Sequence, residues 1–312
     1  MIYTVTLNPA LDRELTVPAL VFDEVLRATE SRADCGGKGF NVSRMLSALG
    51  APSIALGFAG GHIGEMLHDG LTALGVETDF VWIAGETRTN ISIVAADHGQ
   101  HIKVNEPGPI ITADEQAVLR THVRERARRG DWWVLAGSLP PGVAPTFYAD
   151  LIHDIQATGA RVLVDTSGAA LRHGCAAQPF LAKPNAAEAG ELAGIPVMST
   201  KQALAAAEAL PGIPNLVISM GASGAVLIQA GHGWLATPPA IHQRNPIGAG
   251  DSLVAGLAWG LSQGYTPAET LRWGVACGTA TAAHAGTAVG TYAEVAAITR
   301  QVAIREITAV DY

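Results

Sequence analysis

The segment Gly248-Ala249-Gly250-Asp251 has residue types and spacing suited to phosphoryl transfer. Small residues let backbone N–H groups approach a ligand closely, and a helix N-terminus adds unpaired donors and a positive dipole. Leucines at four-residue spacing from 253 to 261 predict that a helix follows. We therefore predict an anion pocket here, with Asp251 placed to take a proton from an attacking hydroxyl. The alternative, which the motif alone slightly favours, is that Asp251 only caps the helix.

A second glycine-rich turn, Gly36-Gly37-Lys38-Gly39-Phe40-Asn41, adds a cation and an amide. It does not match a P-loop, because Gly39 rather than Ser or Thr follows Lys38. Lys38 and Asn41 are candidates to hold a sugar or its phosphate. The alternative is a tight turn with an exposed lysine, and the motif by itself is weak evidence.

The segment Lys183-Pro184-Asn185-Ala186-Ala187-Glu188 has an amide and a carboxylate three residues apart, which share one face of a helix. Glu188 is a candidate to orient water around Mg²⁺, an ion that binds few protein ligands and keeps several waters. The competing interpretation is a capping box, with Asn185 as N-cap and Glu188 at the third helical position. The segment in isolation favours the capping box.

Asp12 and Arg88 are candidates for binding a sugar phosphate. Asp12 follows the first predicted strand, and ligands of parallel sheets bind beyond the carboxyl ends of the strands. It is therefore placed to accept hydrogen bonds from sugar hydroxyls. Arg88 carries a guanidinium, which suits phosphate recognition. The alternatives are an ordinary loop carboxylate and a surface arginine.

The composition is that of a globular chain with a large core. Of 312 residues, 48% are hydrophobic and only 15% are charged, which excludes a disordered chain and a coiled coil. The net charge of −8 argues against a nucleic-acid partner. Three well-separated cysteines and an N-terminus without signal-peptide features predict a cytoplasmic protein with reduced thiols. The uncharged segment 274–293 is rich in Ala, Thr and Gly, so we predict a buried helix there and no membrane partner.

Apolar runs rich in β-formers recur along the chain, and helical patterns lie between many of them. Continuous Val, Ile and Leu within the runs indicate a parallel sheet covered by helices on both faces. The predicted strands are 2–7, 53–58, 90–96, 132–136, 161–165, 216–220 and 225–229. One predicted helix follows Lys38, and four others cover 112–129, 146–158, 200–210 and 252–261.

Two stretches, about 11–34 and 86–105, break this alternation of strands and helices. The second alternates apolar and polar residues around Asp97-His98-Gly99, a hairpin-like turn. Alternation implies one exposed face, so the two stretches are able to pair into a small sheet standing off the core. A lid over a site is the functional interpretation. An ordinary surface hairpin is the alternative, and the pattern alone favours it.

The motifs, taken in order, resemble those of the ribokinase-like PfkB carbohydrate kinases. The order is NPALD, GGKGFN, GETRTN, AGSLPPG, VDTSG, KPNAAE, ISMGASG and GAGDS, and it runs from Tyr3 to about Gly290. The resemblance implies a single α/β domain over 1–312, a three-layer sandwich with a mainly parallel central sheet and a small β lid. It also implies transfer of the ATP γ-phosphoryl group to a sugar-phosphate hydroxyl, with Mg²⁺.

The same resemblance implies roles for individual residues. Asp251 would be the base, and Gly248, Ala249 and Gly250 would form the anion hole. The sugar phosphate would meet Asp12, Gly37, Lys38, Asn41, Arg88 and Ser138. ATP would meet Lys183, Asn185, Ser219, Gly221, Gly224, Gly248, Gly250 and His284, with Glu188 organising Mg²⁺ and its water. Some members bind K⁺ near the anion hole, where Asn245 and Ile247 occupy matching places, and some form homodimers through the lid.

Features of the sequence divide between two branches of the family. Asn245-Pro246, where a Thr is common, is similar to tagatose-6-phosphate kinases, whereas MIYTVTLNP, RADCGGKGFNVSR and LRWGVACGTATA resemble 1-phosphofructokinases. Lys38 argues against the minor 6-phosphofructokinase, which typically has Gly there. The expected reaction is therefore conversion of fructose 1-phosphate to fructose 1,6-bisphosphate, with tagatose 6-phosphate and fructose 6-phosphate as alternative substrates.

Two rival classes of protein share the expected fold. One is a non-catalytic sugar-phosphate sensor, because fold does not guarantee chemistry. The retained Asp251 argues against it, since a sensor does not need a base. The other is a nucleoside kinase, which we would expect to lack cations at Lys38 and Arg88.

Overall fold

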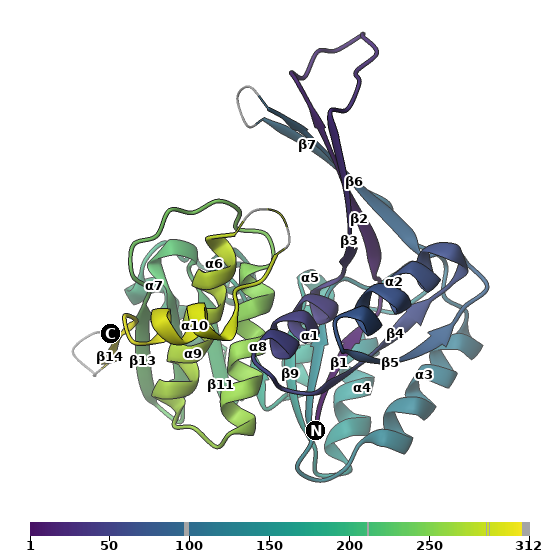
Figure 1. The fold of residues 1–312 in the computed structure, drawn as a ribbon. Helices are drawn as coiled ribbons and strands as arrows, with labels where there is room; N and C mark the ends of the chain where they lie inside the picture. Colours follow the sequence, from purple (N-terminus) through teal and green to yellow (C-terminus); the bar gives the residue numbers. More distant parts are fainter. Residues whose placement is uncertain (97–99, 211, 285, 287, 308–312) are drawn as a thin grey trace.

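A computed structural model of the chain describes residues 1–96, 100–210, 212–284, 286 and 288–307 (Figure 1). Within these residues, ten strands form a central sheet in the order β14-β13-β12-β11-β10-β9-β8-β1-β4-β5. The strands from β11 to β5 pair in parallel, and β12, β13 and β14 add an antiparallel edge. The fold is thus three-layered and mostly parallel, as the sequence predicted.

The strands of the central sheet are β1 (Ile2–Thr6), β4 (Ser53–Ala59), β5 (Glu77–Trp82), β8 (Trp132–Ala136), β9 (Arg161–Asp165), β10 (Leu181–Ala182), β11 (Asn215–Ser219), β12 (Ala225–Gln229), β13 (His232–Thr237) and β14 (Ala303–Ile307). The helices are α1 (Lys38–Ala48), α2 (Gly61–Ala73), α3 (Ala113–Arg126), α4 (Phe147–Gln156), α5 (Gly168–Ala176), α6 (Ala186–Ala193), α7 (Thr200–Glu208), α8 (Ala249–Ser262), α9 (Pro267–Ala282) and α10 (Tyr292–Thr299).

Successive side chains of each buried strand serve opposite faces of the sheet, as the two-residue period of a strand requires. In β8, Trp132 and Val134 pack in a core with α1, α8, α9 and α10, whereas Trp133 and Leu135 pack against α3 and α4. Helix α2 covers the same face of the sheet as α1. Helices α6 and α7 cover the opposite face over β10, β11 and β12. Both faces are covered, so the strands are continuously apolar.

Four further strands form a small sheet that projects from the body beside α2 (Figure 1). They are β2 (Ala10–Val17), β3 (Glu30–Gly36), β6 (Arg88–Ala95) and β7 (His101–Asn105), in the order β3-β2-β6-β7. The pairing of β2 with β6 is parallel and joins the two stretches that break the sequence alternation. The expected turn at Asp97-His98-Gly99 lies outside the described residues.

The strands and helices that were predicted lie within a few residues of observed elements, but several elements were not predicted, namely β5, β10, β13, β14, α2, α5 and α10. The strand predictions 132–136, 161–165 and 225–229 coincide with β8, β9 and β12. The predicted helices 112–129, 146–158 and 200–210 correspond to α3, α4 and α7. The buried helix predicted over 274–293 was too long, because α9 ends at Ala282 and α10 begins only at Tyr292. Among the residues described, no helix has both the length and the apolar character needed to cross a membrane.

Candidate active site

Asp251 lies in the first turn of α8, where the chain leaves a left-handed Gly248 (φ 78°) and enters the helix. Its side chain makes no capping bond to the helix; instead the Asn41 Nδ2 of α1 donates to Asp251 Oδ2 at 2.8 Å. The interpretation of Asp251 as a simple cap is therefore wrong, because Gly248 occupies the N-cap position. The carboxylate is only 8% exposed and is held by an amide from a segment 210 residues away.

The surroundings of Asp251 suit a base at neutral pH. Burial, followed by repulsion from Asp165, raises the pKa of Asp251 to about 6, while Asn41 and two lysines act in the opposite direction. A carboxyl group with this pKa is mostly ionised at pH 7, yet it is a stronger base than an ordinary aspartate. Next to it, the first N–H groups of α8 have no carbonyl partner within the helix and carry the positive end of its dipole.

Two lysines meet on one carboxylate beside this base. Lys38 Nζ lies 3.1 Å and Lys183 Nζ lies 3.4 Å from the same Asp165 Oδ1. Asp165 and Lys183 are almost fully buried. Burial opposes the charge of Lys38, but Asp165, Asp251 and Glu188 outweigh that effect and raise its pKa. The Lys38 ammonium therefore lies beside Asp251 as a charged group that is able to stabilise a transferring phosphoryl group.

Asp165 is a functional candidate that was not assigned from the sequence. It is the last residue of β9, and a carboxylate at the carboxyl end of a parallel strand is where ligands of such sheets bind. The same rule that selected Asp12 would have selected it. Asn90 was also not assigned from the sequence. Its contact with Asp12 depends on the register in which β6 pairs with β2, which the sequence does not show.

Asp12 lies on the small sheet in one cross-strand row with Asn90 of β6 and Asp34 of β3. Asn90 Nδ2 donates to Asp12 Oδ1 at 2.8 Å, and Asn90 itself is 8% exposed. A Cβ at Gly36 would lie 2.3 Å from Asp12 Oδ2, so only glycine leaves room for this carboxylate. The contacts fix the Asp12 carboxylate in one orientation at the base of the small sheet.

Arg88 stands two residues before Asn90, on the same face of β6. Its Nη1 donates to Glu106 O at 2.8 Å and its Nη2 to Asn8 O at 3.0 Å. Burial lowers the pKa of Arg88, and the carboxylates of Asp12 and Glu106 oppose that change. Within the described part of the chain its Nε is buried without a hydrogen-bond partner, which leaves a donor for an anion.

Gly37 lies against Thr6 at the end of β1, and Ser138 follows the neighbouring strand β8. Gly37 is the N-cap of α1 at φ 134°, where a Cβ would come within 2.7 Å of Thr6 Cγ2. Ser138 follows β8 and lines a cavity of about 400 Å³ together with Thr166 and Ser167 at the start of α5. The structure thus puts both residues at the carboxyl edge of the central sheet, which is the edge that carries Asp165.

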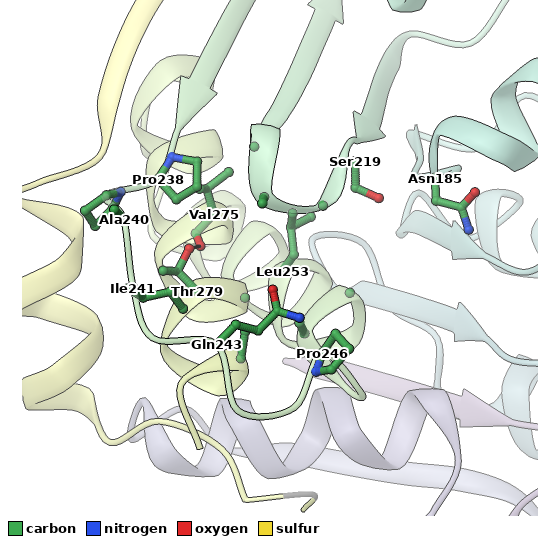
Figure 2. Close-up of a pocket in the computed structure, with 18 residues that line it drawn as sticks. Asn185, Ser219, Pro238, Ala240, Ile241, Gln243, Pro246, Leu253, Val275 and Thr279 are labelled. Carbon is green, nitrogen blue, oxygen red and sulfur yellow. Dashed lines mark hydrogen bonds between the residues drawn. The ribbon is translucent and has the colours of Figure 1, made fainter. Parts of the chain in front are cut away.

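A larger cavity, about 650 Å³, is lined in part by Ala249 and Gly250 at the start of α8 (Figure 2). Five of the residues predicted to contact ATP line it: Asn185, Ser219, Gly221, Gly224 and Gly250. Most of the remaining wall is apolar and was not predicted: Pro238, Pro239, Ala240, Ile241, Pro246, Leu253 and Val275, with Gln243, Gly278, Thr279 and Ala282 also contributing. These residues come from the segment 238–246, α8 and α9, and they carry no motif that marks them in a sequence.

Lys183, Gly248 and His284 do not line this cavity. Lys183 points to Asp165, and Gly248 forms the turn into α8. The His284 ring lies 3.2 Å from Glu294 Oε2, a carboxylate that also caps α10 through Thr291. The role of His284 beside adenine stays a prediction, since its ring is held against α10 rather than on the cavity wall.

Asn185 and Glu188 form the capping box that the segment in isolation favours. Asn185 Oδ1 accepts from Glu188 N at 2.9 Å, and Glu188 Oε2 accepts from Asn185 N at 2.8 Å. Capping does not separate Glu188 from the charged groups around Asp165, because its charge is close enough to help raise the pKa of Lys38. No group of three or more His, Cys, Asp or Glu residues with metal-binding geometry occurs in the described part of the chain.

Asn245 and Ile247 form the turn that leads into Gly248. Asn245 Oδ1 accepts from Ile247 N at 3.0 Å, and Asn245 Nδ2 donates to Gly286 O at 2.9 Å. The side chain of Asn245 is therefore engaged at both ends, so any cation here would have to bind main-chain carbonyl oxygens.

Comparison with known proteins gives one consistent result. The model of the "pfkB family carbohydrate kinase" matches residues 6–293. The chain is 36% identical to a 1-phosphofructokinase of Rhodobacter capsulatus over 98% of both chains, and 33% identical to a tagatose-6-phosphate kinase of Staphylococcus epidermidis over 87% of this chain and 89% of that one. The structure of phosphofructokinase-2 from Escherichia coli in complex with potassium superposes with a TM-score of 0.92 at 31% identity, covering 96% of this chain and 98% of that one. This chain belongs to the PfkB family of carbohydrate kinases.

Proposed function

We propose that this chain transfers the γ-phosphoryl group of ATP to the 6-hydroxyl of fructose 1-phosphate, giving fructose 1,6-bisphosphate and ADP. The observation that carries the proposal is the buried Asp251 carboxylate, held by Asn41 at the start of α8 between a charged cleft and a large apolar cavity. The similarity of the chain to 1-phosphofructokinases over nearly its whole length supports fructose 1-phosphate as the sugar substrate.

In the proposed reaction Asp251 accepts the proton of the sugar 6-hydroxyl while that oxygen bonds to the γ-phosphorus. The bond between the γ-phosphorus and the bridging oxygen breaks, and ADP leaves with the electron pair. The N–H groups of Gly248 and Gly250 hold the equatorial oxygens, whereas the Ala249 N–H, also expected in the anion hole, donates to Pro246 O at 3.2 Å. The ammonium groups of Lys38 and Lys183 stabilise the charge. Asn41 keeps one oxygen of Asp251 engaged, which orients the other toward the hydroxyl.

The sugar phosphate is held by the small sheet and the neighbouring strand ends. Asp12, fixed by Asn90, accepts bonds from sugar hydroxyls. Arg88 and Ser138 hold the 1-phosphate, and the buried Nε of Arg88 supports this role because a planar guanidinium suits a phosphate. Gly37 lets the backbone approach the sugar closely.

ATP occupies the cavity of about 650 Å³, with adenine against its apolar walls and the phosphates near Asn185 and Gly250. Mg²⁺ bound with ATP would supply positive charge that neutralises the phosphates. Glu188, whose carboxylate already acts on Lys38, would hold the water of that ion. The carbonyls of Asn245 and Ile247 would hold K⁺, as the potassium complex of the Escherichia coli relative suggests by analogy.

We propose one kinase domain over the whole chain, with the small sheet as its lid and a second copy of the chain against the outer face of that lid. Apolar side chains gather on this outer face, where Leu15 pairs with Ile93, Ile93 with Ile102 and Ile91 with Val104. Val104 is 56% exposed. Val104→Asp should shift the chain toward the monomer in size-exclusion chromatography. The free thiols of Cys35, Cys175 and Cys277 support a cytoplasmic location.

The test is a side-by-side measurement of kcat/KM for fructose 1-phosphate, tagatose 6-phosphate and fructose 6-phosphate, with ADP release as the readout. Fructose 1-phosphate should give the highest value. A higher value for tagatose 6-phosphate would support the alternative carried by Asn245-Pro246 and by the tagatose-6-phosphate kinase relative. Binding of sugar phosphate without ADP release would instead indicate a sensor.

A further inference from the structure

Arg32 projects from β3 on the face of the small sheet that carries Asp34 and Asp12. Residues two apart in a strand share a face, and Asp34 stands directly opposite Asp12. Arg32 Nε donates to Asp34 Oδ2 at 2.6 Å, which fixes the direction of the guanidinium. Arg32 was not among the residues selected from the sequence.

The guanidinium of Arg32 lies against Gly286, which follows α9 on the nucleotide side. A Cβ on Gly286 would stand 1.9 Å from Arg32 Nη1 and 2.4 Å from Arg32 Cζ. Gly286 also has a φ of 61°, which favours glycine. The close approach therefore depends on the absence of a side chain at this position.

Gly286 connects directly to the turn before the anion hole. Its carbonyl accepts from Asn245 Nδ2, and Asn245 Oδ1 in turn accepts from the amide of Ile247, one residue before Gly248. A continuous series of contacts thus links the small sheet to the start of α8. It runs from Arg32 to Gly286, and from there through Asn245 to Ile247.

We propose that Arg32 is a positioning residue that couples sugar-phosphate binding to the shape of the anion-hole turn. The inference rests on the reaction proposed above, in which Asp12 binds the sugar. A sugar bound to Asp12 holds the small sheet in place, and Arg32 on that sheet then holds Gly286 and Asn245. Coupling of this kind is reciprocal, so each substrate should tighten the binding of the other by the same factor.

The first experiment measures the Kd of a non-hydrolysable ATP analogue by calorimetry, with and without saturating fructose 1-phosphate. In Arg32→Ala the tightening caused by the sugar should fall at least threefold relative to the unmodified chain, and kcat should fall while the Kd for the analogue alone is unchanged. Arg300→Ala, which removes an exposed arginine after α10, is the matched control and should retain the full tightening. Unchanged tightening in Arg32→Ala would overturn the proposal.

Two further variants separate the contact from a general effect of charge. Arg32→Lys keeps a cation for Asp34 but loses the flat group against Gly286, so it should recover only part of the coupling. Gly286→Ala should lose as much coupling as Arg32→Ala, and the double variant should lose no more than either single one. Additive losses in the double variant would show that the two residues act separately.

A measurement without substrate keeps the proposal independent of the choice of sugar. In the ligand-free chain, hydrogen exchange at the amide of Ile247 should be faster in Arg32→Ala than in Arg300→Ala, because Asn245 has lost part of its support. Equal exchange would contradict the inference whatever the substrate is. Lack of activity of the unmodified chain on all three sugar phosphates would instead contradict the proposed function.

Discussion

The proposed active site has two sides, a sugar side and a nucleotide side, which are built from different kinds of groups. The sugar side, formed by the small sheet, α1 and the end of β9, holds its carboxylates and cations in direct contacts of 2.8 to 3.4 Å. The nucleotide side is a cavity of about 650 Å³ whose wall is mostly proline, alanine, isoleucine, leucine and valine. In the proposed function, the sugar side would thus work through the orientation of a few charges, whereas the nucleotide side would work through shape. Single substitutions should therefore have larger effects on the sugar side.

The largest effect is expected at Asp251, where the two sides meet. Asp251→Asn keeps the size of the side chain but removes the base, so kcat should fall by roughly 10²–10⁴. The Kd for ATP should change little, because Asp251 is not part of the cavity wall. Single-turnover kinetics and calorimetry measure the two quantities. Near-normal turnover would mean that another group accepts the proton.

Arg88 should show the next largest effect, confined to the sugar. Arg88→Met should raise KM for fructose 1-phosphate about 10- to 100-fold, since a hydrogen bond to a charged group contributes about 1.5–3 kcal/mol. KM for ATP should stay within about twofold. Lys38→Met is the informative comparison. Lys38 forms an ion pair with Asp165 beside the proposed base, so this substitution should lower kcat more than it raises KM. Equal increases in both KM values for Arg88→Met would contradict the division into two sides.

A substitution in the cavity wall should have a smaller effect and act on ATP alone. Ile241→Ala shortens an apolar side chain of the cavity wall that is 37% exposed and would be covered by bound ATP. The loss of this buried apolar area should raise KM for ATP about 3- to 10-fold. Ile110→Ala, at an exposed isoleucine that does not line the cavity, is the control. A change in KM for the sugar phosphate would show that the two sides are not separable at this position.

The smallest effect is a shift in pH dependence. Because Asp251 must be ionised to act, kcat/KM should rise with pH through an acid limb near pH 6. The charge of Asp165 contributes to raising that pKa, so Asp165→Asn should move the limb to lower pH. Thermal unfolding checks that the variant is folded. A limb that stays in place would mean that it does not report Asp251.

The sequence predicted the central sheet and the charged motifs because both depend on local patterns. Continuous apolar runs mark buried strands, and a glycine-rich turn before a helix marks an anion site. Asn90 could not be selected in this way, since its contact with Asp12 joins residues 78 positions apart and exists only in the register of β2 with β6. The wall residues Ile241 and Val275 were missed because apolar side chains look alike whether they face a ligand or the core.

The parallel pairing of β2 with β6 also sets an order of folding. Between these two strands the chain must place β3, α1, β4, α2 and β5, so their pairing closes a long loop whose entropy cost precedes any gain from contacts. The antiparallel run β11-β12-β13 needs only short connections. During refolding of the full chain, the small sheet should therefore form late, after β11, β12 and β13 have their native pairing.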